Sequence, residues 1–513
     1  MMNHPASRSP RLSRRTFVKS TAAAAAAALA TTRWTAKSYA AISGANEGVR
    51  MATIGFNGRG VSHIDCIKKV KGLKLIAVCD VDPKILNKKG DQVADGATKY
   101  QDLRKLLEDK NLDAVSIATP NHWHALAAIW AIQAGKDVYC EKPVSHNVSE
   151  GRRIVDFARH NGKIVQAGTQ SRASRQGIAQ GVDYVRSGKL GKIKVARALC
   201  YKRRPTIGKT TTPTQPPPGL DFDLWTGPAE KLPIMRQHLH YDWHWVWNTG
   251  NGDMGNQGIH EVDVARWFLG AQELSPQILS VGGRKGYVDD GQTPNELIVW
   301  HGYPEAPLVV ETRGLADKLY PAGVKEKMDN YKGASVGIVI ECENGYVTVP
   351  SYGKAIVHDL SGNEVTKFED KGKGDSTVQH FENFLKAVHS RKKEDLYADI
   401  EEGHLSSALC HTGNISYRLG EQASPDEIKE KIKADASFEE TFNRMAEHLA
   451  ANKIDLAKDQ LTLGVPLKMD GKAELFIDNA KADEMLTRRH RCDGQRACSF
   501  LNGNAACALE KGD

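Results

Sequence analysis

The chain has 513 residues, of which 40% are hydrophobic and 26% are charged, and its formal net charge is +8. The length allows two or three cores, because a single core stops growing near about 250–300 residues. Seven basic residues and no acidic ones lie within residues 1–40, so the rest of the chain is nearly neutral and has no large basic patch for nucleic acid.

The first predicted element is an export signal. Ser13-Arg14-Arg15-Thr16-Phe17 precedes an alanine run from Ala22 to Ala28, and Ser38-Tyr39-Ala40 offers small residues for cleavage. An arginine pair before a weakly apolar segment is the pattern of a twin-arginine signal, and the segment is short and alanine-rich for a membrane anchor. We expect residues 1–43 to be removed and the mature protein to be periplasmic or extracellular, with no membrane attachment.

From residue 44 to 168 the hydrophobic pattern alternates between strands and amphipathic helices. Short apolar strands separated by helices form a parallel sheet covered on both faces, and ligands bind beyond the carboxyl ends of its strands. The expected strands are Val49–Ile54, Leu73–Cys79, Ala114–Ala118, Asp137–Cys140 and Lys163–Gln166.

A glycine-rich turn, Gly55-Phe56-Asn57-Gly58-Arg59-Gly60, follows the first strand and opens a helix. In that context it matches a fingerprint that holds a pyrophosphate on the N–H groups of a helix start, although Asn57 replaces its middle glycine. Asp80 ends the second strand, where a carboxylate would bind ribose hydroxyls and repel a 2′-phosphate. Taken alone, the glycine-rich segment also fits an ordinary strand–helix turn, and Asp80 also fits a turn residue at the end of a strand. Together they predict a Rossmann domain that binds NAD rather than NADP, through Gly55, Asn57, Gly58, Arg59, Gly60 and Asp80.

Two further segments follow predicted strands at the same edge of the sheet. They are Thr119-Pro120-Asn121-His122-Trp123-His124 and Glu141-Lys142-Pro143. A lysine there can contact both the nicotinamide ribose and a substrate hydroxyl, whose pKa its charge would lower. An isolated lysine is more often a solvated surface charge. The expected cofactor contacts in these segments are Thr119, Pro120, Asn121, His124, Glu141 and Lys142.

Longer apolar runs after residue 169 predict a second α/β domain with a mostly antiparallel sheet, residues 169–420. Helices are expected at Thr377–Arg391 and Asp399–Leu419. Ser424-Pro425-Asp426-Glu427 is a capping box that opens a charged helix, so residues 421–513 are expected to be a helical extension and tail. The expected strands are Lys192–Tyr201, Ile278–Val281, Glu296–Trp300, Pro307–Thr312, Ser335–Glu341 and Tyr346–Pro350.

His260 begins a helical pattern in this second domain. An imidazole suits a general acid/base, although a lone histidine is more often a capping or core residue. Asn256 and Asp263 lie one helical turn away on either side and could orient it.

Tyr241, Trp243, Trp245 and Trp247 would share one face of a strand, where Trp243 could stack on a sugar, although such a stripe is more often core. No metal is expected: His238, His240 and His244 have no matching ligand motif, and no Cys-x-x-Cys occurs. Cys66, Cys79 and Cys140 are expected to be buried thiols.

Together, Gly55 to Gly60, Asp80, Thr119-Pro120, Glu141-Lys142-Pro143 and Gly258-x-His260-x-x-Asp263 resemble the Gfo/Idh/MocA family over about residues 49–420. Leu220 to Pro228 and Asp399 to His404 resemble its secreted, twin-arginine branch. The resemblance implies a Rossmann domain followed by an open, mostly antiparallel α/β domain whose sheet often mediates oligomerisation, so a homo-oligomer is expected.

The resemblance also implies roles for individual residues. Lys142 would be the active-site lysine and His260 the catalytic histidine, and the substrate contacts would be Lys142, Trp243, Asn256, His260 and Asp263. The family commonly has an aspartate where this chain has Asn256, and an amide cannot take up a proton. Asp253 or Asp263 could supply that charge.

Three functions are consistent with these features. The first is an NAD-dependent oxidoreductase acting on a sugar, sugar derivative or cyclitol, with a tightly bound cofactor because no NADH pool is expected outside the cytoplasm. The second is a glycoside hydrolase that works by transient oxidation, elimination and reduction. The third, motivated by Asn256, is a carbohydrate-binding protein without turnover.

Overall fold

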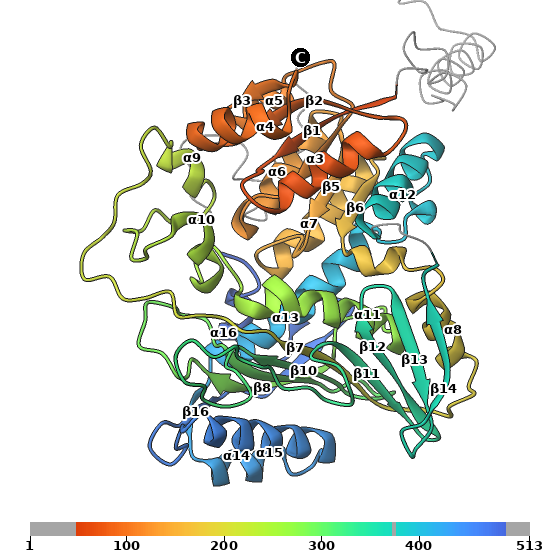
Figure 1. Cartoon of the computed structure of the whole chain (residues 1–513), viewed down its shortest axis with the longest axis vertical. Helices are drawn as coiled ribbons and strands as arrows, with labels where there is room; N and C mark the ends of the chain where they lie inside the picture. Colours follow the sequence, from red (N-terminus) through yellow and green to blue (C-terminus); the bar gives the residue numbers. More distant parts are fainter. Residues whose placement is uncertain (1–47, 372–375, 489–513) are drawn as a thin grey trace, which may run out of the picture.

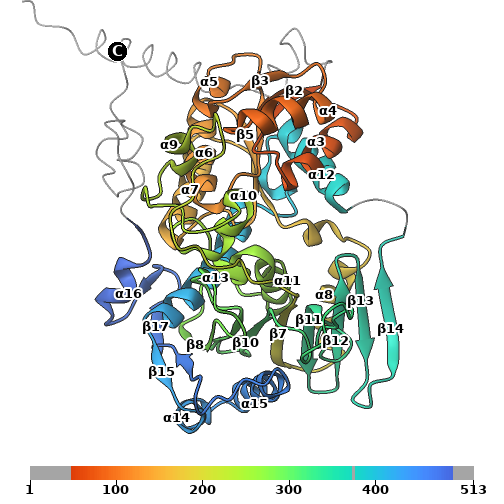
Figure 2. The ribbon, with the colours of Figure 1, turned by 60° about the vertical axis from the view of Figure 1, so that its left-hand side comes forward.

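The computed structural model describes residues 48–371 and 376–488, so the predicted export signal lies outside the described residues. The described part contains two sheets with helices packed between them (Figures 1 and 2). None of its helices combines the length and the apolar character that a membrane crossing requires. Six cysteines of the described residues are buried, and Cys66, Cys79 and Cys140 are among them, as predicted.

The first sheet is parallel, and its strand order, β3-β2-β1-β4-β5-β6, is that of a Rossmann domain. The order reverses between β1 and β4, which places a crevice at the carboxyl ends of these strands. The prediction missed β3, which has only three residues. The strands are β1 (Val49–Ile54), β2 (Leu73–Cys79), β3 (Thr98–Tyr100), β4 (Ala114–Ile117), β5 (Asp137–Glu141) and β6 (Val165–Gly168).

Helices cover both faces of this sheet (Figure 1). They are α3 (Arg59–Lys69), η1 (Ile85–Lys89), α4 (Gly90–Val93), α5 (Leu103–Leu107), α6 (Asn121–Gln133) and α7 (Val148–His160). α12 (Ser376–Ser390) returns to this domain from far along the chain, and its Phe381 stacks on Tyr139 of β5 with ring centroids 4.2 Å apart. Residues 376–390 therefore pack with the first domain although the sequence assigned them to the second.

The second sheet is mixed and mostly antiparallel, which confirms the predicted fold class. β7 and β10 run parallel, and the other pairs described in it are antiparallel. Its strands are β7 (Ile193–Tyr201), β8 (Gln277–Gly283), β9 (Glu296–His301), β10 (Leu308–Arg313), β11 (Val336–Cys342), β12 (Gly345–Ser351), β13 (Lys354–His358), β14 (Glu364–Glu369), β15 (Glu421–Ala423), β16 (Leu461–Leu463) and β17 (Leu467–Asp470), with β18 (Leu475–Phe476) paired to β17.

The inner face of this sheet packs against helices that lie between the two sheets (Figure 1). They include α8 (Ile178–Arg186), the π-helical turn η4 (Met254–Gly258), α11 (Ile259–Leu269) and α13 (Ile400–Arg418). η2 (Gln170–Ala173) contacts α8, α11 and α12, and η5 (Lys393–Asp395) contacts α12. α13 also contacts α7 of the first domain, so the domains share one packed boundary.

Residues after 420 do not form a separate helical extension, because β15 and β16 continue the sheet beside β8. α14 (Pro425–Ile432) starts with the predicted capping box, and α15 (Ala436–Ala451) follows; α16 (Ala480–Glu484) comes near the end of the described residues. α14 and α15 cover the outer face of β8, β9 and β10 with buried side chains such as Phe442.

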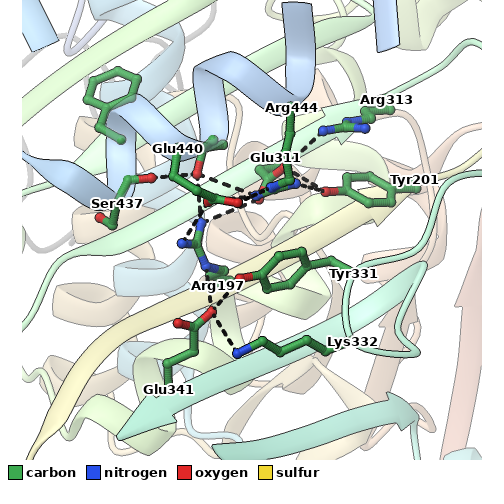
Figure 3. Close-up of polar contacts among 12 residues, drawn as sticks. Arg197, Tyr201, Glu311, Arg313, Tyr331, Lys332, Glu341, Ser437, Glu440 and Arg444 are labelled. Atoms are coloured by element: carbon green, nitrogen blue, oxygen red, sulfur yellow. Dashed lines mark hydrogen bonds and ion pairs between the residues drawn. The ribbon is translucent and has the colours of Figure 1, made fainter. Parts of the chain in front are cut away.

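A buried ion-pair network joins α15 to the sheet (Figure 3). Arg444 of α15 lies 2.7 Å from the Glu311 carboxylate on β10, and Arg197 of β7 lies 2.9 Å from Glu440 of α15. Burial raises the pKa of Glu311, but the Arg444 charge outweighs it and holds the pKa below its ordinary value. The extension is therefore fixed by charge as well as by apolar contact.

The aromatic segment 238–247 does not form a strand, so its aromatic residues do not share a strand face. It forms α10 (Leu239–Asp242) and a 3₁₀ turn, η3 (Trp243–Trp245), which follow α9 (Phe222–Thr226) in the long connection after β7. This connection lies beside the first domain in both views (Figures 1 and 2).

Candidate active site

A cavity of about 850 Å³ lies at the carboxyl ends of the parallel strands and extends to the second domain. It brings together most of the sequence-predicted site residues. Those in its lining are Gly55, Asn57, Gly58, Arg59, Asp80, Thr119, Pro120, Asn121, His124, Glu141, Lys142, Trp243, Asn256 and His260. Gly60 and Asp263 are not among the lining residues.

The glycine turn has the geometry that a pyrophosphate requires. Gly55 has a φ of +77°, and a Cβ there would lie 3.0 Å from the backbone of Ala118 and Thr119. A Cβ at Gly58 would meet nothing within 4 Å, and no side chain caps the start of α3. Free N–H groups at an uncapped helix start, with open space before them, fit a bound pyrophosphate.

Gly60 has a packing role. A Cβ at this position would lie 2.0 Å from the Gly55 carbonyl oxygen, so any side chain would push α3 away from the turn. Gly60 thus allows the close approach without lining the cavity itself, which corrects the predicted direct contact.

Asp80 is held at the end of β2 by the backbone. Its carboxylate accepts hydrogen bonds from the N–H groups of Phe56 and Asp82, both at 3.1 Å. Burial raises its pKa, and these two hydrogen bonds oppose that shift. The side chain lines the cavity, so its remaining acceptor sites fit ribose hydroxyls.

Glu141 organises the centre of the cavity. Its Oε1 lies 2.9 Å from Arg59 Nε and 3.0 Å from His63 Nε2, and it accepts a hydrogen bond from Gln170 Nε2 at 2.9 Å. Burial alone would raise the pKa of Glu141, but the Arg59 charge and the His63 hydrogen bond hold it well below its ordinary value. The Glu141 carboxylate is therefore ionised, and the Arg59 guanidinium already balances its charge.

Lys142 follows Glu141 directly and reaches across to the second domain. Its Nζ donates a hydrogen bond to the backbone oxygen of Asn256 at 2.7 Å. Burial lowers the pKa of Lys142, and the Glu141 charge partly opposes this. The lysine is poised to bind a hydroxyl oxygen at the boundary between the domains.

His260 lies in the first turn of α11 and is only 8% exposed. Burial and the Lys142 charge hold its pKa well below the ordinary value, so the imidazole is neutral at neutral pH. Within the described residues its Nδ1 has no hydrogen-bond partner, and its ring lies 5.4 Å from that of Tyr352. A neutral imidazole is a base with capacity to take a proton.

Asp263 and Asp253 do not serve His260. The Asp263 carboxylate pairs with Arg172 at 2.8 Å and accepts a hydrogen bond from Ser406, and Asp253 pairs with Arg204. Both carboxylates are thus paired with arginine side chains rather than with His260. The prediction that Asp263 contacts substrate or orients His260 is therefore wrong, and neither aspartate supplies the charge that Asn256 lacks.

Trp243 forms part of an aromatic wall. Its ring stacks on that of His244 at 3.6 Å, and both line the cavity with Tyr241. His240 of the same segment also lines the cavity and lies 2.8 Å from Asp82, two residues after Asp80. The described residues contain no group of three or more potential ligands that could hold a metal ion.

The lining residues that sequence reasoning missed include Gln170, Lys202, Gln257 and Tyr352. Gln170 and Lys202 each closely follow a predicted strand, which is a signal that could have indicated them. Gln257 precedes His260 in the same helical segment. Tyr352 lies between β12 and β13, where nothing in the sequence marks it.

Gln257 connects Lys202, Tyr352 and Glu261. Its Oε1 accepts a hydrogen bond from Lys202 Nζ at 2.8 Å, and its Nε2 lies 2.7 Å from the Tyr352 hydroxyl and 3.1 Å from Glu261 Oε1. The substrate end of the cavity is therefore a polar wall built from the second domain.

Two family models match the chain in succession. Residues 49–169 match the NAD-binding Rossmann fold of the Gfo/Idh/MocA oxidoreductase family, and residues 182–300 match its C-terminal α/β domain. An inositol 2-dehydrogenase of Rhodococcus jostii is 24% identical over 398 residues, covering 75% of this chain and 95% of that protein.

Two solved structures share the fold. A levoglucosan dehydrogenase in complex with NADH and levoglucosan has a TM-score of 0.52 and 18% identity, covering 71% of this chain and 95% of that one. The WlbA dehydrogenase from Bordetella pertussis, in complex with NADH and UDP-GlcNAcA, has a TM-score of 0.50 and 20% identity, covering 71% and 94%. The glycine turn, Asp80 and the two matched domains agree on one assignment: the chain belongs to the Gfo/Idh/MocA family and is an NAD-binding oxidoreductase.

Proposed function

We propose that this enzyme oxidises a hydroxyl group of a sugar, sugar derivative or cyclitol and keeps its NAD bound between turnovers. The observation that carries the proposal is that Lys142 and His260 line the same cavity as the glycine turn and Asp80. The names of the relatives, which refer to inositol and levoglucosan, support a polyhydroxylated substrate.

The chain's own residues would move the proton. Bound NAD would supply the hydride acceptor. His260, neutral because of burial and Lys142, takes the proton of the substrate hydroxyl, and the Lys142 ammonium stabilises the alkoxide that develops. The Asn256 side chain in the cavity wall can donate or accept a hydrogen bond to substrate but cannot carry the proton.

The compartment and the assembly are part of the proposal. Residues 1–43 would direct folded export by the twin-arginine route, so the cofactor would be acquired before export and recycled within the site. We also propose a homo-oligomer in solution. Fractionation of the producing cell and the mass of the purified protein test these two points separately.

His240, which lines the cavity, contacts Asp82 close to the expected ribose site at Asp80, and this contact favours a retained cofactor. A retained cofactor would also serve the redox glycosidase. Denaturing the purified protein and identifying the released nucleotide tests the first step. Candidate sugars and glycosides are then followed by NADH absorbance and by free sugar. Oxidation of a sugar with formation of NADH supports the proposal. Oxidation of one sugar together with reduction of a second sugar supports it as well.

Sugar release from glycosides without net NADH would instead identify the glycosidase. Binding of sugars with neither product nor change in the cofactor would identify a binding protein. Absence of any released nucleotide would contradict the retained cofactor.

A further inference from the structure

We infer that the substrate carries a carboxylate, which pairs with the ammonium group of Lys202 at the wall of the cavity. This inference rests on the proposed function and narrows its substrate class from sugars in general to sugar acids.

Two ammonium groups are anchored at neighbouring points of the cavity wall. Lys142 Nζ donates to the backbone oxygen of Asn256 at 2.7 Å, and Lys202 Nζ donates to Oε1 of Gln257 at 2.8 Å. Asn256 and Gln257 are consecutive residues of η4, and both lysines line the cavity. The two charges are close enough that Lys202 contributes to the lowered pKa of Lys142.

No salt bridge to a carboxylate neutralises either ammonium group among the described residues, although the Glu141 charge opposes the lowering of the Lys142 pKa. Two acidic residues line the cavity, Asp80 and Glu141. Glu141 is already paired with Arg59, and Asp80 ends β2, in the first domain's part of the cavity. Within residues 48–371 and 376–488, neither lysine lies within salt-bridge distance of a carboxylate, so an anion bound there would relieve the repulsion between them.

Glu261 lies behind this wall but supplies no charge. Its Oε1 accepts a hydrogen bond from Gln257, and its Oε2 is buried without a partner among the described residues. Burial raises the pKa of Glu261 to about 8, although Lys202 and Lys142 oppose the shift. The carboxyl is therefore mostly protonated at neutral pH, and the wall keeps its positive charge.

The arrangement fits a monoanion better than a dianion. Lys142 is engaged with the reacting hydroxyl, which leaves one ammonium, that of Lys202, for a second substrate group. A carboxylate balances one such charge, whereas a phosphate carries nearly two. Trp243 and Asn256 line the same cavity, and their indole ring and amide suit the sugar ring and its hydroxyls.

The test uses the NAD-loaded full-length enzyme with matched hexoses, hexuronates and hexose 6-phosphates of the glucose and galactose series. Turnover is followed by NADH and by product analysis, and binding by titration calorimetry. We expect a KM and a dissociation constant at least about tenfold lower for the hexuronate than for the matching hexose, as for a charge-assisted contact.

Variants assign the preference to one side chain. Lys202→Gln should remove the preference by raising the KM for the hexuronate at least about tenfold relative to the KM for the matching hexose. Lys202→Arg should keep part of the preference. Lys194→Gln, at an exposed lysine of β7, the strand that Lys202 directly follows, is the matched control and should behave as the parent.

Neutral sugars oxidised without a preference for the acids would overturn the inference and leave the proposed function intact. A preference for the 6-phosphates over the uronates, or a preference for uronates that persists in Lys202→Gln, would overturn it as well. Failure of every sugar to bind or react would contradict the proposed function itself.

Discussion

At the scale of single residues, the surroundings of Lys142 and His260 shift both pKa values downward. This shift suits the two roles proposed for them, stabilising the alkoxide and taking the proton. Burial disfavours the charged form of each side chain, and the Lys142 charge further disfavours a second cation on His260. The Glu141 charge opposes the lowering of the Lys142 pKa. One cation and one neutral base then face the same cavity.

Lys142→Met should therefore depress turnover far more than cofactor binding. The loss of the ammonium removes the group that stabilises the alkoxide, and we expect kcat to fall by roughly 10²-fold or more. The dissociation constant for NAD should change little, because the glycine turn and Asp80 are untouched. Steady-state kinetics and NAD titration check both values. Equal losses in kcat and in NAD affinity would show that Lys142 mainly holds the cofactor.

Glu261→Gln should stabilise the fold at high pH. Burial raises the folded-state pKa of Glu261 from 4.5 to about 8, so the folded chain holds a proton that the unfolded chain releases. Stability then falls by about 1.4 kcal/mol per pH unit between these two values and stays lower above them. Glutamine has no proton to release, so the variant's advantage should be absent below pH 4.5, grow to a few kcal/mol near pH 8 and level off.

Denaturant unfolding of both proteins from pH 4 to pH 9 measures this difference. Glu273→Gln, at an exposed position after α11, is the control and should show no such trend. A constant difference between Glu261→Gln and the parent across the range would contradict the raised pKa.

Sequence alone located the site residues whose positions follow from strand ends and helix starts. Lys142 directly follows β5 and His260 begins α11, so pattern reasoning could reach both. The predicted role of Asp263 beside His260 was wrong because spacing along a helix does not reveal ion-pair partners from other elements. Its partners, Arg172 and Ser406, come from η2 and α13.

At the scale of elements, the parallel strands were predictable because both of their faces are buried and their sequences are continuously apolar. β1 and β2 have the expected limits. The aromatic segment 238–247 resembles a strand in sequence because four aromatic residues occupy alternate positions in it. Only some point inward: Trp245 is buried, whereas Tyr241 is 48% exposed, so the alternation does not mark two faces of a strand. β15 to β18 are too short for any hydrophobic period to develop.

The covering helix α15 gives a prediction about stability. Phe442 is fully buried between α15 and the outer face of the second sheet. Phe442→Ala should cost about 3–5 kcal/mol, because it removes apolar contact and leaves a cavity. NAD affinity of the folded protein should not change, since Phe442 does not line the active-site cavity.

Chemical denaturation measures the loss, and Asn443→Ala, at the exposed neighbouring position, is its control. A variant as stable as the parent would mean that α15 contributes little to the fold. In that case the ion pairs of Arg444 and Arg197 would also add little to the free energy of unfolding.

At the scale of the whole molecule, the cavity lies between domains that the long connection after β7 ties together. Gln101 Nε2 donates to the Gly219 oxygen at 3.2 Å, and Trp123 Nε1 donates to the Trp225 oxygen at 2.9 Å. The His240–Asp82 contact then lies two residues from Asp80. The connection therefore crosses the end of the cavity where the ribose of the cofactor would lie.

His240→Ala should release the cofactor faster. The imidazole Nε2 and the Asp82 carboxylate lie 2.8 Å apart, and no other ion pair of the described residues joins this connection to Asp82. With the contact removed, the connection can move away from the cavity, and we expect the rate of NAD loss to rise roughly tenfold or more, as when one charge-assisted contact is lost. At saturating NAD, kcat should stay close to that of the parent, because Lys142 and His260 are unchanged.

Dilution of the NAD-loaded protein, followed by the fluorescence of bound NADH after reduction, measures the rate. Asp82→Asn should act in the same direction, and the double variant should add little, because both changes break one contact. Lys231→Ala, at an exposed position of the same connection, should release cofactor as the parent does. An unchanged rate in His240→Ala would mean that retention depends on the glycine turn and Asp80 alone.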